Sequence, residues 1–235
     1  PPSVPSRLLL KLSRLQGAEP SLTGERRQAE VDFYSRIAPL MPRPPVPRCH
    51  SAAYAPASGA AHLLFDDLSQ THHAYKSVDW VDRPAGEALM RALAQIHAFW
   101  WERPTLGDMP ARPTAQRVAA DIDEMRQWYP RFADVLGEQL SPQWRRTYER
   151  VQAALPRLLQ RLTDGRPLTL IHGDANLSNS LLPRDAARHR ALIIDWEFWN
   201  ISYVGEDLAN LMALFWPREQ RQALELPLLR TYHAA

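Results

Sequence analysis

Residues 172–179, with the sequence HGDANLSN, constrain the fold of this chain more than any other feature. They place a carboxylate at Asp174 and an amide at Asn179, and a later apolar run, residues 191–194, ends in a second carboxylate at Asp195. A carboxylate that ends a buried strand loses hydration unless a partner compensates for it. Mg²⁺ prefers hard oxygen ligands and takes only one or two protein carboxylates. We therefore expect Asn179 and Asp195 to be metal ligands at one site.

Simpler interpretations exist for the same residues. Gly and Asp are common in turns, so the HGD segment alone is also typical of a turn that ends a strand. Asp195 alone would also fit a helix N-cap or a surface position. The spacing of Asp174, Asn179 and Asp195 favours a shared site, in which Asp174 accepts the proton of an incoming hydroxyl group. That arrangement is typical of phosphoryl transfer.

Lys11 and Lys76 are the only lysines in a chain whose basic residues are otherwise arginine. Lys11 lies in the Leu-rich segment 7–12, which we interpret as a short buried strand, where an ammonium group needs a partner. Glu30, on a helix expected at 25–38, is the best candidate. A strand Lys paired with a helix Glu holds nucleotide phosphates in kinases. The alternative is an edge-strand Lys and a solvated Glu.

Two further polar residues are expected to support the loop. We expect His172 to bond the backbone near Asp195 rather than to take part in catalysis. Asp207 stands at the start of a helix predicted at 205–215. It is either an acid that favours the helix dipole or a brace for the backbone amides of the HGD loop.

The remaining pattern predicts an α+β fold. Strands are expected at 7–12, 49–57, 60–65, 168–171 and 191–194, a loop at 17–24, and helices at 25–38, 83–101, 115–136, 141–162, 205–215 and 219–232. This is the order of a two-lobe, protein-kinase-like fold. We expect a partial, β-rich N-terminal lobe at 1–67 and a larger helical C-terminal lobe at 68–235, in which a β-insert carries the catalytic loop.

The tryptophans, two histidines and the acidic residues of one helix are interpreted from their place in the pattern. Four tryptophans on apolar helical stripes are expected in the core: Trp100, Trp128, Trp144 and Trp216. Trp196 and Trp199 flank the metal site and could shape a substrate pocket. His72 and His73 have no metal-ligand spacing and are expected at the surface. The acidic residues of helix 115–136 favour a solvated face over a site for an amine-bearing substrate.

Composition excludes several classes of protein. The 235 residues are 45% hydrophobic and 23% charged, which is typical of a globular chain. The net charge of +2 does not indicate nucleic-acid binding, and no apolar run is long enough to predict a membrane span. Cys49 is the only cysteine, so an internal disulfide and a cysteine zinc cluster are excluded, and a reducing, cytoplasmic setting is expected.

The segment 172–179, the IIDW run at 193–196 and the DLA triplet at 207–209 together resemble the aminoglycoside phosphotransferase, choline kinase and ecdysteroid-kinase-like superfamily. Its members show H-G-D-x-x-x-x-N, then I-D-W or I-D-F, then a D-L-A helix. Residues 63–68 look like their hinge, and residues 92–101 look like the helix that follows it. The resemblance covers nearly the whole chain.

This resemblance implies a phosphotransferase that uses ATP, or GTP, with Mg²⁺ and acts on a hydroxyl group of a small molecule. Backbone groups of Asp66 and Leu68 would pair with the purine edge, and Leu181 and Ile194 would pack beneath the ring. Lys11 would hold the α- and β-phosphates. The resemblance does not indicate which acceptor is used or which oligomer forms.

A Gly-rich loop should precede the Lys strand, but none of the nine glycines clusters before Lys11. We expect that loop to lie outside the given sequence, which begins without Met. If the loop is missing altogether, the chain would be a pseudokinase or a nucleotide-binding module. A third hypothesis is a metal-dependent hydrolase that uses His172, Asp174 and Asp195, although it leaves Lys11 and Glu30 unexplained.

Overall fold

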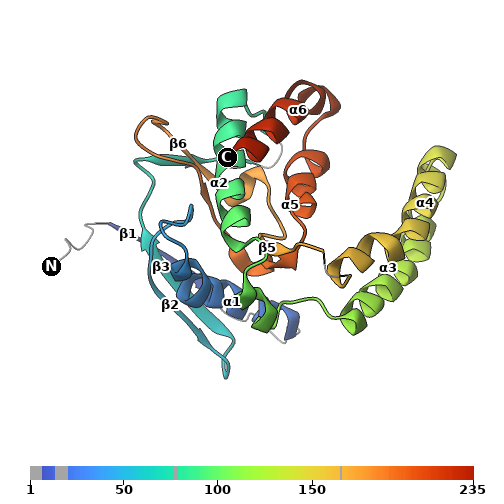
Figure 1. Cartoon of the computed structure of the whole chain (residues 1–235), viewed down its shortest axis with the longest axis horizontal. Coiled ribbons are helices and arrows are strands. Elements are labelled where there is room, and N and C mark those ends of the chain that lie inside the picture. The colour runs from blue at the N-terminus through green and yellow to red at the C-terminus, as the bar shows by residue number, and fades with distance from the viewer. Residues whose placement is uncertain (1–6, 14–20, 77–78, 165) are drawn as a thin grey trace.

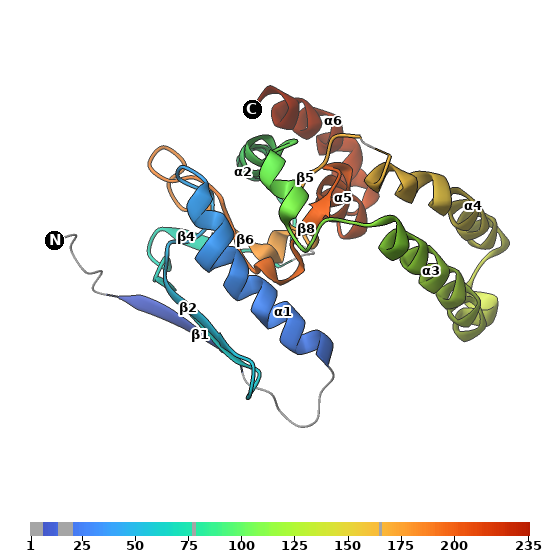
Figure 2. The same ribbon diagram turned by 60° about the horizontal axis from the view of Figure 1, so that its bottom comes forward.

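The computed structural model describes residues 7–13, 21–76, 79–164 and 166–235. Its N-terminal part is a three-stranded antiparallel sheet in the order β1-β3-β2, with helix α1 lying along one face (Figures 1 and 2). The elements are β1 (Leu8–Ser13), α1 (Ser21–Asp32), β2 (Cys49–Ala55) and β3 (Ala60–Asp66). A single π-helical turn, Phe33–Ile37, extends α1. The paired strands expected at 49–57 and 60–65 are confirmed.

Two predictions for this part were wrong in detail. The strand containing Lys11 is present, but its leucines at 8, 9, 10 and 12 are 41–58% exposed rather than buried. The reason is that β1 pairs only with β3 within the described residues, and α1 packs on β2 and β3. The helix begins at Ser21, so residues 21–24 of the expected loop are helical, and residues 17–20 lie outside the described residues.

An extended, proline-rich segment, residues 41–48, lies between the 3-10 turn Ala38–Leu40 and strand β2. We call it the linker. Its Pro45 carbonyl accepts a hydrogen bond from Ile193 N (2.8 Å), and its Arg48 carbonyl accepts one from Asp66 N (3.2 Å). The linker therefore connects the end of β3 with the strand that leads to Asp195.

Helix α2 (Arg83–Trp100) is the central element of the C-terminal part. The Asp82 side chain caps its first turn by accepting from Ala85 N, and Pro84 occupies a position where no backbone N–H is needed. The face formed by Leu89, Leu93 and Trp100 is buried. Helix α6 (Arg218–Ala234) packs on α2. No helix among the described residues is long and apolar enough to cross a membrane.

Short strands carry the HGD loop. Strand β5 (Thr169–Ile171) pairs with β8 (Asn200–Ser202), and β6 (Ser180–Pro183) lies between β4 (His72–Ala74) and β7 (Leu192–Ile193). Helix α5 (Gly205–Ala209) follows and continues as a π-helical turn, Asn210–Leu214. The sequence pattern predicted β5 and β7 as apolar runs, but it did not predict β4, β6 or β8, because three or four residues without a longer apolar run are too few to show a period.

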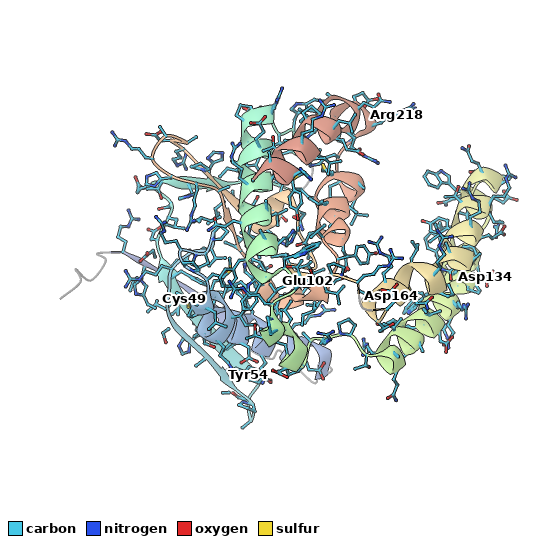
Figure 3. The ribbon with its side chains drawn as sticks, in the orientation of Figure 1. Cys49, Tyr54, Glu102, Asp134, Asp164 and Arg218 are labelled. Atoms are coloured by element: carbon cyan, nitrogen blue, oxygen red, sulfur yellow. The ribbon has the colours of Figure 1, made fainter. Side chains whose placement is uncertain are left out.

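Helices α3 (Ala115–Leu136) and α4 (Pro142–Leu159) form a hairpin that extends away from the body (Figures 1 and 2). Figure 3 shows Asp134 of this hairpin far from Cys49 and Tyr54 of the sheet. Trp128 and Trp144 lie on it and are 58% and 60% exposed, so the core positions predicted for them were wrong. An amphipathic pattern shows which face is apolar, but not whether another element covers it. Trp100 and Trp216 are buried, as predicted.

Candidate functional site

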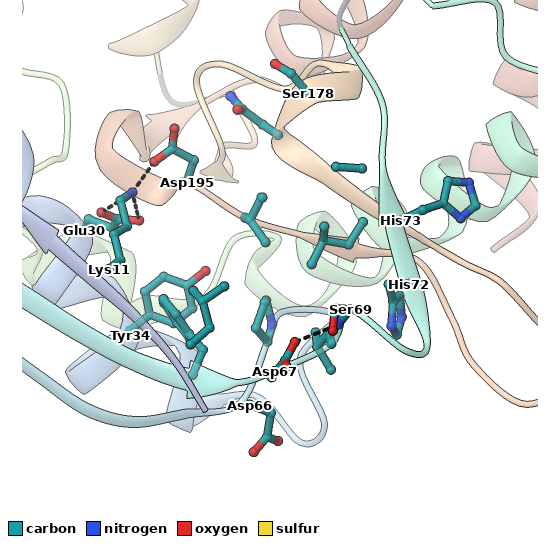
Figure 4. A pocket seen from close by; sticks show the side chains of 18 of the residues that line it. Lys11, Glu30, Tyr34, Asp66, Asp67, Ser69, His72, His73, Ser178 and Asp195 are labelled. Carbon is teal, nitrogen blue, oxygen red and sulfur yellow. Dashed lines mark hydrogen bonds and ion pairs between the residues drawn. The ribbon is translucent and has the colours of Figure 1, made fainter. Parts of the chain in front are cut away.

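A cavity of about 600 Å³ opens between β1 and β3 on one side and β4, β6 and the residues that follow β7 on the other (Figure 4). Its lining includes all of the residues predicted to hold a nucleotide or a metal ion: Lys11, Glu30, Asp66, Leu68, Asn179, Leu181, Ile194 and Asp195. These residues come from both ends of the chain, and the fold brings them together around one space. Its volume falls in the range typical of small-molecule sites.

Lys11 lies at the edge of this cavity between two carboxylates (Figure 4). Its Nζ is 2.8 Å from both Oε atoms of Glu30 and 2.6 Å from Oδ1 of Asp195. Burial lowers the pKa of Lys11, but hydrogen bonds and charge attraction from Asp195 and Glu30 outweigh it, and the net pKa is raised. The ammonium form is therefore stabilised here, and the Lys11–Glu30 pairing predicted from the sequence is present.

Asp195 takes a left-handed backbone conformation, with φ 67° and ψ 58°. Asp is one of the few non-glycine residues that adopt this region readily. The residue precedes a 3-10 turn, Trp196–Phe198, but its side chain makes no capping hydrogen bond. The backbone turn therefore directs the carboxylate to Lys11 and the cavity, and the alternative of a simple helix cap does not describe it.

Asp174 is held by two amide side chains. Asn179 Nδ2 donates to its Oδ2 (2.9 Å) and to its backbone carbonyl (3.0 Å). Asn176 Nδ2 donates to its Oδ1 (3.2 Å). Both carboxylate oxygens therefore have a fixed orientation, and Asn179 Oδ1, the only acceptor atom of that amide, remains as the atom that could ligate a metal ion.

Asp207 braces the backbone that carries Asp174. It is fully buried and accepts from His172 N (2.7 Å) and Gly173 N (2.8 Å). Burial raises its pKa, but hydrogen bonds and charge interactions with His97 and His172 outweigh this, so the pKa of Asp207 is lowered. Of the two sequence interpretations of Asp207, the brace is the one observed.

A model of the phosphotransferase enzyme family, APH, matches residues 3–235. The chain belongs to this family. The fold is similar to that of an aminoglycoside-3'-phosphotransferase of type VIII, with 21% identity and a TM-score of 0.53 over 97% of this chain and 77% of that one. The GDP and kanamycin complex of APH(2'')-IIIa also matches, with 14% identity and a TM-score of 0.46 over 94% and 81%. No curated protein sequence matches significantly.

The donor set of this phosphotransferase suits Mg²⁺. One carboxylate, Asp195, and one amide, Asn179, line the same cavity, and both offer oxygen atoms. Mg²⁺ is usually bound by one or two carboxylates, with substrate phosphates and waters as the remaining ligands. The described residues contain no cluster of three His, Cys, Asp or Glu side chains that could hold a metal ion by themselves. A metal ion here would therefore depend on ligands from the substrate.

The position of His172 bears on the hydrolase hypothesis. Its Nε2 lies 2.9 Å from the Ile194 carbonyl, and its Nδ1 accepts from Asp174 N at 3.2 Å. Both ring nitrogens are thus engaged by backbone, which agrees with the structural role predicted for His172. This ring is not directed at a metal site formed with Asp174 and Asp195.

Sequence reasoning missed two supporting residues. His97 lies on the buried face of α2, where its Nε2 is 3.1 Å from Asp207 and its Nδ1 is 2.8 Å from Tyr232 Oη. A polar residue within an apolar helical stripe needs a partner, and this was the available signal. Asn176 was the second, and its Oδ1 accepts from Ser178 N at 2.9 Å, the Asx turn that Asn commonly makes two residues on.

The packing of three more residues, His72, Trp196 and Trp199, differs from what the sequence suggested. His72 is buried rather than at the surface, because it lies in β4, which pairs with β6, and its Nε2 is 3.0 Å from the Arg190 carbonyl oxygen. Trp196 is buried and stacks on Phe33 with ring centroids 3.9 Å apart, and Trp199 Nε1 donates to a carbonyl of α1. Both tryptophans therefore pack against the first helix, and neither lines the cavity.

The acidic face of α3 is largely neutralised by its own arginines. Asp121 pairs with Arg117 at 2.9 Å, and Asp123 lies 3.7 Å from Arg126. This supports the solvated helix face that was favoured from the sequence.

Proposed function

We propose that this protein transfers the γ-phosphoryl group of ATP, or of GTP, to a hydroxyl group of a small molecule, in a Mg²⁺-dependent reaction. The observation that carries the proposal is the position of Lys11. Its ammonium group joins Glu30 of the first helix to Asp195 at the edge of one cavity. The cavity also contains Asn179, whose amide holds Asp174. These are the parts that phosphoryl transfer requires: cationic groups, metal ligands and a base.

Each residue has a distinct role in this proposal. Lys11 binds the α- and β-phosphates, and Glu30 fixes the direction of its side chain. Asn179 and Asp195 hold Mg²⁺, which supplies positive charge against the phosphates as negative charge develops. Leu181 and Ile194 pack beneath the purine. Leu68 would pair through its N–H, because its carbonyl already accepts from Thr71 N and His72 N.

Asp174 orients the acceptor hydroxyl group and takes its proton. Both of its carboxylate oxygens are held by amide side chains, so little rotation is needed before reaction. A positioned base typically contributes about 10²–10⁴-fold to a rate. Asp207 keeps the loop backbone in place and does not itself contact the acceptor.

The finer description of the fold belongs to this proposal. We propose the two-lobe arrangement of protein kinases, with residues 1–67 forming a partial N-terminal lobe and residues 68–235 the helical lobe. The cavity between β1 and β3 on one side and β4, β6 and the residues that follow β7 on the other supports this division. Asp66 and Leu68 then form the hinge, where backbone groups meet the purine edge.

The test is nucleotide binding followed by turnover. ATP or GTP with Mg²⁺ is expected to raise the melting temperature. At a nucleotide concentration of 100 times Kd, binding stabilises the folded state by about 2.7 kcal/mol. A panel of small hydroxyl compounds is then screened for phosphorylation. Asp174→Asn is expected to remove turnover while it leaves the nucleotide-dependent shift in place. Asp185→Asn, at an exposed loop position, is the matched control.

Two results would separate the alternatives. Nucleotide binding with no phosphorylation of any acceptor would favour a binding module or pseudokinase. Undiminished turnover by Asp174→Asn on a true substrate would remove Asp174 from the mechanism and the proposal with it.

A further inference from the structure

Two neighbouring hollows lie beside the linker, next to the cavity at Lys11. One, of about 320 Å³, is lined by Arg43, Arg48 and Arg190 together with Tyr34 and Pro47. The other, of about 660 Å³, is lined by Arg43, Arg188 and Arg190, with His72 and His189. Arg43 and Arg190 line both hollows, so they stand on the boundary between the two spaces.

The charge of this region is unbalanced. Among the described residues, no Asp or Glu lines either hollow. Arg188 pairs with a carboxylate, Asp185, at 3.4 Å, whereas no ion pair joins a described carboxylate to Arg43, Arg48 or Arg190. Most other arginine pairs in this chain are with an acid on the same helix, as for Arg83 and Glu87. The linker arginines therefore carry positive charge that the described protein does not neutralise.

Arg190 is anchored rather than freely solvated. Its guanidinium donates to the Pro44 carbonyl (2.8 Å) and to Gln95 Oε1 (3.3 Å). Partial burial lowers the pKa of Arg190, and the charge of Arg43 lowers it further. Two like charges held close together are destabilising, and an anion placed between them removes that repulsion. The fixed donors of a guanidinium also match the geometry of phosphate oxygens.

We propose that the hollows beside the linker bind a small phosphorylated compound with at least two negative charges, held by Arg43 and Arg190. Arg48 and Arg188 lie on either side to take further oxygens. The site is separate from the cavity at Lys11, but it adjoins it: Tyr34 and Pro47 line both that cavity and the smaller hollow, and His72 lines both that cavity and the larger one. Inorganic pyrophosphate is the simplest probe of this chemistry.

The experiment is calorimetric titration of pyrophosphate into the whole protein at fixed ionic strength. Arg43→Gln and Arg190→Gln are each expected to weaken binding at least tenfold. Arg43→Gln is the cleaner change, because its side chain has no hydrogen bond of its own among those described. Arg146→Gln, at an exposed position on α4, is the matched control for loss of one positive charge and is expected to bind within twofold of wild type.

Lys11→Ala separates the two sites. Binding that persists in Lys11→Ala and is lost in Arg43→Gln supports the proposal. Binding that is lost in Lys11→Ala and unchanged in Arg43→Gln assigns pyrophosphate to the Lys11 cavity and overturns it. Equal weakening of pyrophosphate binding in Arg146→Gln would show that only overall charge matters and would overturn the proposal. The absence of a saturable binding heat in wild type would also overturn the proposal. If Lys11→Ala does not fold, the proposal is tested by comparing Arg43→Gln with wild type: weaker pyrophosphate binding supports it, and unchanged binding overturns it.

Discussion

Asp207→Asn tests whether a buried charge organises the HGD loop. The substitution keeps the size of the side chain but removes the negative charge and one of its two acceptor oxygens. In the wild type those oxygens accept from His172 N, Gly173 N and His97 Nε2, at 2.7, 2.8 and 3.1 Å. An asparagine leaves one loop N–H facing an NH₂ group, and a buried N–H without an acceptor costs about 1–3 kcal/mol.

The remaining hydrogen bonds also weaken, because bonds to a charged acceptor contribute roughly 1 kcal/mol more than neutral ones. Together these effects predict a loss of about 3 kcal/mol, against a total stability of about 5–15 kcal/mol for a typical domain. Urea unfolding monitored by far-UV circular dichroism measures this loss. Under the proposed function, the same variant is expected to lower kcat more than it raises KM, because Asp174, the proposed base, moves while the cavity at Lys11 stays intact.

The pH dependence gives an independent test of the same residue. Because the pKa of Asp207 is lowered in the folded state, its contribution is present above the unfolded pKa of about 3.9 and is lost as the pH falls through the folded value. The gap in stability between wild type and Asp207→Asn should therefore be constant above about pH 5 and narrow below about pH 4. A gap below about 0.5 kcal/mol at pH 7 would refute this reasoning, since exposed substitutions usually fall within about that range and Asp185→Asn is expected to do so.

Further substitutions address the backbone and the core. Gly173 has φ +81°, and a Cβ there would lie 2.3 Å from the Phe198 carbonyl oxygen. Gly173→Ala should therefore destabilise the protein by at least about 2 kcal/mol and reduce turnover, measured by thermal unfolding and phosphorylation assay, and a variant with wild-type stability would contradict this. Trp196→Ala removes the ring stacked on Phe33 and is expected to lower the free energy of unfolding by about 3–5 kcal/mol in urea titrations. Trp128→Ala is its control on the exposed hairpin, with a change within about 0.5 kcal/mol, and equal losses in the two variants would show that burial is not the cause.

Four of the cavity-lining residues, Lys11, Glu30, Asn179 and Asp195, were predictable because each has a chemical requirement that the sequence displays, whereas Asp66, Leu68, Leu181 and Ile194 were expected only from the family resemblance. An ammonium in a Leu-rich strand needs a carboxylate, and Lys11 indeed meets Glu30. The pairing with Asp195 was not predicted, because it depends on where β7 ends relative to β1, and residues 184 positions apart leave no local pattern. The same limit applies to His97, whose partner Asp207 lies 110 residues away.

Burial was less predictable than secondary structure. The helices α3 and α4 were expected close to their observed bounds, and Ser141 caps α4. However, an apolar face is buried only if another element reaches it, and the hairpin that carries Trp128 and Trp144 stands apart from the body. The leucines of β1 were misjudged for the same reason. The periodicity of apolar residues indicates which face of a helix or strand is apolar, whereas the tertiary structure determines which elements cover that face.

The contact between Lys11 and Asp195 has a consequence for the order in which ligands enter. One ammonium lies between two carboxylates, those of Glu30 and Asp195, so the three groups carry a formal net charge of −1, and Asp174 adds a negative charge against Asn179, which lines the same cavity. Such a site repels a free polyphosphate and attracts a cation. Under the proposed function, we therefore expect the metal–nucleotide complex, rather than the bare nucleotide, to be the species that binds; Asp195 would then hold the metal ion and Lys11 the phosphates.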